Sequence, residues 1–224
     1  MKINKNLFYK VVLFHCVLFS SLANEDKTAK SYQITDNIYS HANIFIGVGL
    51  QQINIEKDNI TYKGKQLKNN VNYYGLIGLG YNIYFSVHNF VHPFIGLDLQ
   101  GKMPFSSTNY MDNNTEYAPD IARKHYHEAF LTHLKLGAKL NISDVFAVMP
   151  YALIGFNVSR FETKVQDLYK TDSKINISVG FGGDVLIYNR FIIALEYRYA
   201  MSRYDNTFVV NSHNFAGKFG VEFL

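Results

Sequence analysis

Cysteine, charge and long apolar runs are all scarce in this sequence. Cys16 is the only cysteine among the 224 residues, and charged residues make up 18%, which is low for a soluble domain. After the first 23 residues the chain has no uninterrupted apolar run of about eighteen residues, the length that a transmembrane helix needs. We therefore expect no membrane-spanning helix in the rest of the chain.

Net charge is close to zero once the amino-terminal lysines are set aside. The chain carries 22 Lys and Arg against 18 Asp and Glu, a formal charge of +4. Lys2, Lys5 and Lys10 account for three of these charges, so the remainder carries +4 − 3 = +1. A nearly neutral chain has little electrostatic attraction to nucleic acid, and nucleic acid is not expected as a partner.

Residues 1–23 have the three regions of a secretory signal peptide. The lysines form a positive start, residues 11–19 form a short apolar run, and small residues precede Asn24, where we expect cleavage. Cleavage there would remove Cys16, which excludes disulfide bonds, thiol catalysis and cysteine-bound metals. The alternative is lipid attachment at Cys16, but the two bulky residues before it disfavour that modification.

Beyond a polar extension at residues 24–40, bulky apolar residues alternate with small or polar ones. A period of two indicates β-strands rather than helices, and no helix is predicted. The fifth of the alternating segments is apolar on both faces, so its phase is left unassigned. The segments are residues 43–51, 71–83, 91–100, 130–142, 145–161, 175–187, 191–202 and 215–223.

The composition of the two faces distinguishes a membrane barrel from a soluble β-sandwich, which would also alternate. One face is bulky and apolar throughout, whereas the other is rich in glycine and charge. This is the arrangement of a barrel with lipid outside and a small polar interior. Glycine on the inner face also relieves crowding where a narrow barrel curves tightly.

The connections between segments alternate between short and long. Residues 84–89, 143–144 and 188–190 are short, whereas residues 54–70, 103–125, 163–171 and 204–212 are longer and polar. Outer-membrane barrels have short periplasmic turns and long extracellular loops. We therefore predict an all-β fold at residues 41–224, an eight-stranded, antiparallel, up-and-down transmembrane β-barrel with four extracellular loops.

Aromatic residues gather at both ends of the predicted strands. Tyr84 and Phe146 are among those near the short turns, and Tyr126, Tyr199 and Tyr204 are among those near the loops. Amphipathic rings favour the two membrane interfaces, so we interpret the groups as girdles. The alternative is that Tyr and Phe are simply good strand formers.

Charged residues on the inner face are predicted to form a polar network inside the barrel. Unpaired buried charge is costly, so these side chains must pair, and the interior of an eight-stranded barrel is just wide enough for side chains to fill it. The alternative is a gated solute path lined by charge. The residues are Asp98, Lys135, Lys139, Asp184, Glu196, Arg198, Lys218 and Glu222.

The carboxyl half resembles the opacity-type outer-membrane β-barrels, relatives of the OmpA membrane domain. The resemblance rests on PYALIGF at residues 150–156, GFGGD at 180–184 and ALEYRY at 194–199, followed by Ser212-His213 and a closing strand. It implies an outer-membrane location, contact with membrane lipid and lipopolysaccharide, and recognition by the barrel-assembly machinery. Family members usually end on Phe. Here Leu224 follows Phe223, and an assembly signal at Phe219, Val221 and Phe223 is shifted by one residue.

Two sets of residues suggest chemistry that we do not expect this chain to carry. His125 and His127 lie on the same side of a strand and could bind a metal, but only Glu116 and Asp120 are nearby as further ligands. Ser212, His213 and Glu196 could form a Ser/His/acid esterase if they met near the outer rim. We predict no catalytic, metal-binding or cofactor-binding residues.

The loops are the expected functional surface. Residues 103–125 carry Tyr110, Met111, Tyr117 and Arg123, which could contact a host or cell-surface ligand. The main hypothesis is a surface antigen or adhesin, or a structural barrel of the envelope. The alternatives are a small-solute pore and a lipid A-modifying enzyme.

Overall fold

The computed structural model describes most of the chain beyond residue 31. The described residues are 32–35, 37–57, 60–62, 71–105, 123–165, 168–204 and 208–223. They belong to a compact unit that begins at Ser31, and the predicted signal peptide lies outside them. Within these ranges no helix is long and apolar enough to cross a bilayer.

Regular structure in the described residues is entirely β, as the alternation predicts. The strands are β1 (Tyr32–Thr35), β2 (Ile38–Lys57), β3 (Ile60–Tyr62), β4 (Val71–Phe85), β5 (Val91–Pro104), β6 (Arg123–Asn141), β7 (Phe146–Val165), β8 (Leu168–Ile187), β9 (Phe191–Tyr204) and β10 (Phe208–Phe223).

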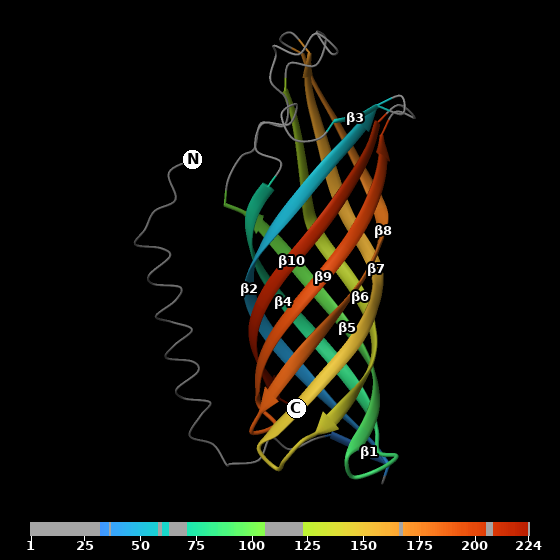
Figure 1. Cartoon of the computed structure of the whole chain (residues 1–224), viewed down its shortest axis with the longest axis vertical. Coiled ribbons are helices and arrows are strands. Elements are labelled where there is room, and N and C mark those ends of the chain that lie inside the picture. Colours follow the sequence, from blue (N-terminus) through green and yellow to red (C-terminus); the bar gives the residue numbers. More distant parts are fainter. Residues whose placement is uncertain are drawn as a thin grey trace, which may run out of the picture. The chain divides into compact units, whose positions relative to one another are not determined.

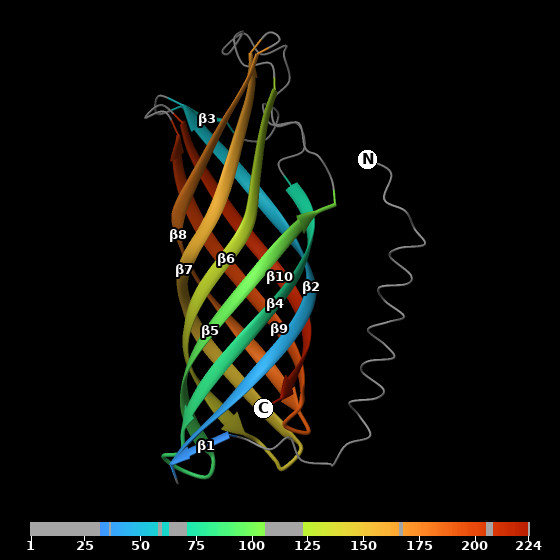
Figure 2. The ribbon, with the colours of Figure 1, turned by 180° about the vertical axis from the view of Figure 1, so that it is seen from behind.

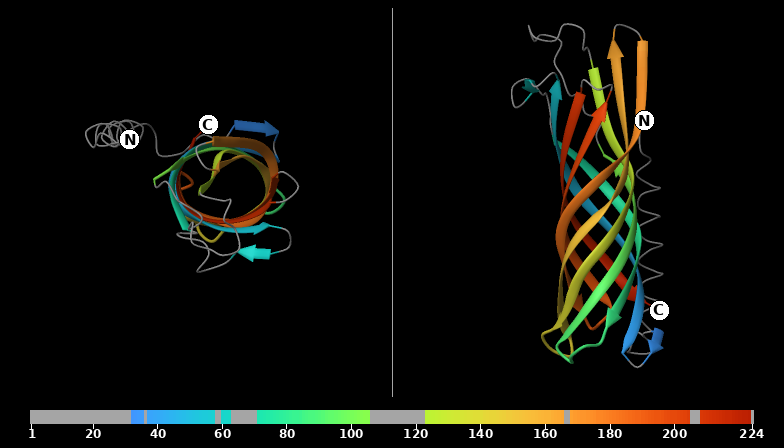
Figure 3. Two further views of the ribbon diagram at one scale, coloured as in Figure 1. Left: turned by 90° about the horizontal axis from the view of Figure 1, so that it is seen from above. Right: turned by 90° about the vertical axis from the view of Figure 1, so that its right-hand side faces the viewer.

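The strands close into an antiparallel barrel in which each main strand pairs with its neighbours in sequence. The ten-stranded sheet runs β1-β2-β10-β9-β8-β7-β6-β5-β4, and β4 pairs back onto β2. Because β1 and β3 pair only with β2, eight strands remain in the barrel itself. Figures 1 and 2 show these strands tilted around a common axis, and the view from above in Figure 3 shows the ring that they form. The predicted eight-stranded barrel is confirmed.

Alternation sorts the side chains into an inner and an outer face. Asn72, Tyr74 and Leu76 of β4 are buried inside, whereas Tyr73 and Ile77 are exposed. The same alternation also assigns the phase of β7, which the sequence left open. Its inward residues are Ala147, Met149, Tyr151, Leu153, Gly155, Asn157 and Ser159.

The strands at one end are joined by the short turns that the sequence predicts. Residues 86–90, 142–145 and 188–190 connect β4 to β5, β6 to β7 and β8 to β9. Tyr188 and Asn189 have φ angles of 54° and 51°, and the Arg190 N–H donates to the Ile187 carbonyl at 3.1 Å. Two central residues with positive φ form the type I′ turn, whose twist suits a β-hairpin.

The strands extend further than predicted at the other end. β7 and β8 pair up to Val165 and Leu168, so most of the predicted loop at residues 163–171 is strand, and only residues 205–207 separate β9 from β10. At the turn end, β2 begins at Ile38, inside the predicted extension. Apolar residues alternate with polar ones only in the part of a strand whose outer face contacts lipid. Polar strand residues beyond that part look like loop in the sequence.

Candidate functional site

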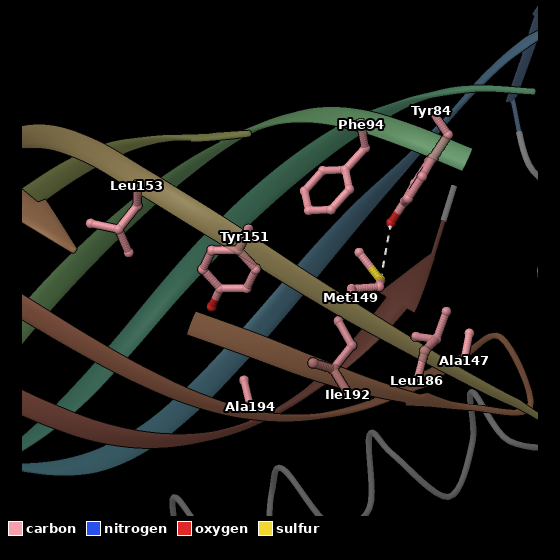
Figure 4. Packing of buried hydrophobic residues seen from close by; sticks show 9 residues of the cluster. All are labelled: Tyr84, Phe94, Ala147, Met149, Tyr151, Leu153, Leu186, Ile192 and Ala194. Carbon is pink, nitrogen blue, oxygen red and sulfur yellow. Dashed lines mark hydrogen bonds between the residues drawn. The ribbon is translucent and has the colours of Figure 1, made fainter. Parts of the chain in front are cut away.

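The interior next to the short turns is filled by an apolar cluster. Tyr84 and Phe94 come from β4 and β5, and Met149 and Tyr151 come from β7, which two strands separate from β4 in the ring. Figure 4 shows these side chains converging in the lumen with Leu186 and Ile192. The rings of Tyr84 and Phe94 lie 5.6 Å apart, and the Tyr84 hydroxyl oxygen lies 3.8 Å from Met149 Sδ. Apolar side chains therefore meet across this part of the barrel.

The middle of the barrel contains a compact ion-pair layer built by five strands. Lys135 Nζ lies 3.0 Å from Asp98 Oδ1 and 4.0 Å from Asp184 Oδ2. Lys218 bridges Asp98, at 3.7 Å, and Glu196. Arg198 Nε lies 3.1 Å from Glu196 Oε1, and Arg198 as a whole is 1% exposed. The three cations and three carboxylates balance. We name this set the central ion layer: Asp98, Lys135, Asp184, Glu196, Arg198 and Lys218.

Aromatic rings and an imidazole enclose the cations of the central ion layer. Lys135 Nζ lies 5.1 Å from the centre of the Tyr151 ring, and Lys218 Nζ lies 4.8 Å from that of Phe45. Such contacts stabilise a cation away from bulk water. His133 Nε2 lies 3.3 Å from Arg198 Nη1. Each cation of the central ion layer therefore contacts an aromatic ring or an imidazole of the barrel interior as well as a carboxylate.

A second ion pair, which the sequence analysis missed, lies nearer the loops. Lys102 Nζ lies 2.6 Å from Glu128 Oε2 and donates to Asn214 Oδ1 at 2.6 Å. Glu128 Oε1 also accepts hydrogen bonds from Ser212 Oγ at 2.8 Å and Tyr126 Oη at 3.1 Å. All five side chains are buried. The pair fixes β5, β6 and β10 to one another across the lumen.

A β-bulge explains why Glu128 was missed. The pairing of β6 with β7 shifts between Glu128 and Phe130, so Ala129 is an extra residue. Inward residues are even-numbered before the bulge, as at Tyr126, and odd-numbered after it, as at Leu131. A bulge reverses the phase of alternation, and the predicted strand began only at Phe130. The alternation of Tyr126 with Glu128 is the signal that could have located this pair.

Two of the predicted network residues lie at the turn end instead of in the central ion layer. Glu222 accepts a hydrogen bond from Tyr84 Oη at 2.7 Å, and His41 Nδ1 lies 2.9 Å from its other oxygen. Lys139 donates to Asn189 Oδ1 at 3.0 Å, and no carboxylate of the described residues lies within 4.0 Å of it. The structure therefore distributes the predicted network along the barrel axis.

Three aromatic residues assigned to the girdles point into the barrel. Tyr84, Tyr126 and Tyr204 are buried, with hydroxyl groups bonded to interior partners. Phe146, by contrast, is exposed on the outer face, as the girdle interpretation expects. Position at a strand end was used for the assignment, but the residue's parity along the strand decides which way its ring points.

The strand geometry separates the three residues of the hypothetical esterase. Ser212 is buried inside and bonded to Glu128, whereas the adjacent His213 is on the outer face, where Tyr197 Oη lies 2.9 Å from its Nδ1. Glu196 is held by Arg198 and Lys218 in the central ion layer. Successive residues of a strand face opposite sides of the sheet, so this triad does not form.

The remaining predicted residues are only partly described. Tyr110, Met111 and Tyr117 lie outside the described residues, and Arg123 begins β6 without a described side chain. The same holds for the side chains of His125 and His127, and the described residues contain no group of three or more potential metal ligands. Phe219 and Phe223 are exposed on the outer face of β10, and Val221 between them is buried.

Several solved structures are similar to this chain at low sequence identity. Among solved structures, Ail, the attachment invasion locus protein of Yersinia pestis, is 14% identical over 84% of this chain and 100% of that chain, with a TM-score of 0.42. Neisserial surface protein A is 12% identical over 80% and 97%, with a TM-score of 0.41. The outer membrane protease OmpT from Escherichia coli is 8% identical over 88% and 98%, with a TM-score of 0.42.

A search of curated proteins finds no match. The model of the outer membrane protein beta-barrel domain matches residues 25–223. Because this match spans most of the sequence and the described strands close into such a barrel, the chain belongs to the outer membrane protein beta-barrel domain family.

Proposed function

We propose that this protein is a surface protein of the outer membrane that displays its loop-side strands and loops outside the cell. The observation that carries the proposal is the length of the β7–β8 hairpin. Among the described side chains, the last exposed apolar residue of β7 is Val158 and the first of β8 is Ile175, yet the two strands stay paired up to Val165 and Leu168. The intervening residues are mostly polar or charged.

This hairpin projects well beyond the lipid-facing band. From Val158 to Val165 the strand advances by roughly 23 Å at 3.3 Å per residue. The upper ends of β7 and β8 stand highest in Figure 1, above those of β9 and β10. A paired, polar extension of this kind carries the loop-side ends of the strands beyond the apolar band. It supports display of the predicted contact residues Tyr110, Met111, Tyr117 and Arg123 to a host or cell-surface ligand.

The filled interior favours display over transport. The apolar cluster occupies the lumen next to the short turns, and balanced ion pairs occupy the middle. An aqueous solute path requires polar walls that remain open to water. The filled interior instead favours a role for the barrel as a structural anchor. We expect outer-membrane lipid to surround this anchor and the barrel-assembly machinery to insert it.

Cysteine labelling on intact cells tests this orientation. Ser173 of β8 and Asp144 of the β6–β7 turn are both exposed and lie at opposite ends of the barrel. We expect Ser173→Cys to react with a membrane-impermeant maleimide on intact cells. Asp144→Cys should react only after the outer membrane is permeabilised. Labelling of Asp144→Cys on intact cells, or protection of Ser173→Cys, would refute the proposed display.

A further inference from the structure

A polar pocket opens where the three short turns meet, at the lower end of the barrel in Figure 1. Its volume of about 480 Å³ is in the range of small-molecule sites. Each of the three turns contributes side chains to it, and so does the end of β6. We name it the turn pocket, and its polar lining includes His88, Lys139, Asn141, Ser143, Asp144 and Asn189.

Lys139 brings a positive charge without a counter-ion to the turn pocket. The residue is 4% exposed, and its ammonium group donates to an uncharged partner, Asn189 Oδ1, at 3.0 Å. No carboxylate of the described residues lies within 4.0 Å of this group. Glu222, deeper in the lumen, already accepts a hydrogen bond from Tyr84 and pairs with His41. A buried charge without an opposite charge is costly, so an anionic ligand would stabilise Lys139.

Aromatic rings lie behind Lys139, on the side of the apolar cluster. Its Nζ atom lies 5.5 Å from the centre of the Tyr84 ring, which stacks on the Tyr39 ring at 4.9 Å. His92 is the cross-strand partner of Lys139, and its ring lies 5.7 Å from that of Tyr39. Nδ1 of His92 is buried and has no hydrogen-bond partner among the described residues. A ligand that enters between the turns therefore stops at Lys139.

Three side chains of the turn pocket have an acceptor atom occupied, which leaves their donor groups for a ligand. His88 Nδ1 accepts from a backbone N–H at 3.2 Å, so the proton of the neutral ring lies on Nε2. Ser143 Oγ accepts from two backbone N–H groups at 3.3 and 3.1 Å, so its hydroxyl hydrogen can be donated. Asn189 accepts through Oδ1, and Nδ2 of the same amide is a donor. A pocket that combines these donors with a cation favours a negatively charged acceptor.

Charge balance favours a carboxylate over a phosphate as this acceptor. Lys139 supplies one positive charge, whereas the exposed Asp144 adds a negative charge to the lining. A carboxylate carries one negative charge and neutralises Lys139. A phosphate group carries up to about two, so Asp144 repels it more strongly.

We propose that the turn pocket binds a small organic molecule through one carboxylate group. The carboxylate pairs with Lys139 and accepts hydrogen bonds from Asn189 and Ser143. A short peptide with a free carboxyl terminus and a sugar acid both carry this group. The proposal goes beyond the display of loops, and it rests on the proposed orientation only in placing the turn pocket in the periplasm.

Isothermal titration calorimetry of the folded barrel in detergent micelles tests the site. The ligands are N-acetyl-alanyl-alanine, its carboxyl-terminal amide, glucuronate and inorganic phosphate. We expect at least one of the two carboxylates to bind more tightly than phosphate, and the amide not to bind. The tighter carboxylate identifies the source of the group as a peptide or a sugar acid.

Two variants of the turn pocket should change this affinity in opposite directions. Lys139→Met removes the charge and keeps the length of the side chain, and we expect the affinity to fall about tenfold or more, as for the loss of a charge-assisted hydrogen bond. Asp144→Asn removes the negative charge of the lining and should raise the affinity at low ionic strength. Lys174→Met is the matched control, because the Lys174 ammonium group also donates to an uncharged acceptor but lies outside the turn pocket. It should leave the affinity unchanged.

Several outcomes would overturn the proposal. They are no binding of either carboxylate, phosphate binding as tight as that of the better carboxylate, and an affinity of Lys139→Met equal to that of the parent or of Lys174→Met. If Lys139→Met does not fold, judged by gel mobility before and after boiling, Asp144→Asn decides the question, because Asp144 is an exposed turn residue. An affinity that does not rise in this variant would then refute the site. Labelling at Ser173 reports on orientation without any ligand, so the two proposals can fail independently.

Discussion

Lys218 is one of two lysines that bridge carboxylates of different strands in the central ion layer. It alone bridges Asp98 and Glu196, which come from different strands, and its ammonium group also lies against the Phe45 ring. Removing one partner of a buried ion pair leaves uncompensated charge in a site with little water. The layer therefore stabilises the barrel only while its charges remain balanced.

We expect Lys218→Met to lower the free energy of unfolding by about 3–5 kcal/mol. The measurement is urea unfolding of the folded barrel in detergent micelles. Arg203→Met is the control, because Arg203 is an exposed cation on the adjacent strand β9, and its urea midpoint should not move. Equal midpoints for the two variants would show that the central ion layer does not stabilise the barrel.

At the residue scale the sequence predicts which side chains face inward wherever a strand is regular. Asp98, Lys135, Asp184, Glu196, Arg198 and Lys218 were identified in this way and lie together. Lys102 and Glu128 were not, because one adjoins a predicted loop and the other precedes a bulge. Alternation also carries no information on height along the barrel axis, so it grouped Lys139 and Glu222 with residues that lie further up the lumen.

At the scale of a strand, β8 shows two different roles for glycine. Gly180 lies on the inner face against the backbone of β9, whereas Gly183 lies on the outer face with open space around it. The sequence GFGGD does not distinguish them, since both positions carry the same residue. Only the phase of the strand and the position of its neighbour β9 separate a glycine required by packing from one that is not.

Alanine substitutions at these two positions should therefore differ strongly. We expect Gly180→Ala to lose most of the folded, fast-migrating band on unboiled gels, because its Cβ atom would collide with the Tyr197 carbonyl. Gly183→Ala should fold fully and gain up to about 1 kcal/mol from its lower chain entropy. A Gly180→Ala variant as stable as the parent in urea would contradict the tight β8–β9 packing.

Strand boundaries were the least predictable feature at this scale. The three short turns lie where Gly-poor, polar residues interrupt alternation, and they agree with the structure. The loop-side ends do not, because β7 and β8 continue as a hairpin after their apolar alternation stops at Val158 and Ile175. Backbone pairing, which needs no particular side chain, continues there without an amphipathic pattern.

For the whole molecule, closure of the sheet and filling of its interior are separate properties. Closure follows from the pairing of β2 with β4 and was predictable from an even number of alternating segments. The filling of the interior could not be predicted from the sequence, because it depends on which inward residues lie at the same level along the barrel axis. Tyr84 and Phe94 lie opposite each other on neighbouring strands, but Met149 comes from β7, and only the closed barrel brings it to them across the lumen.

Single-channel recording in a planar lipid bilayer is the most direct test of the claim that this barrel is a filled anchor. Protein shown to be folded by its altered gel mobility on boiling should produce no conductance steps above those of the bare bilayer, because the apolar cluster and the central ion layer occupy the lumen. Reproducible unitary steps from the folded protein, absent from a boiled sample, would contradict the account and make it a pore.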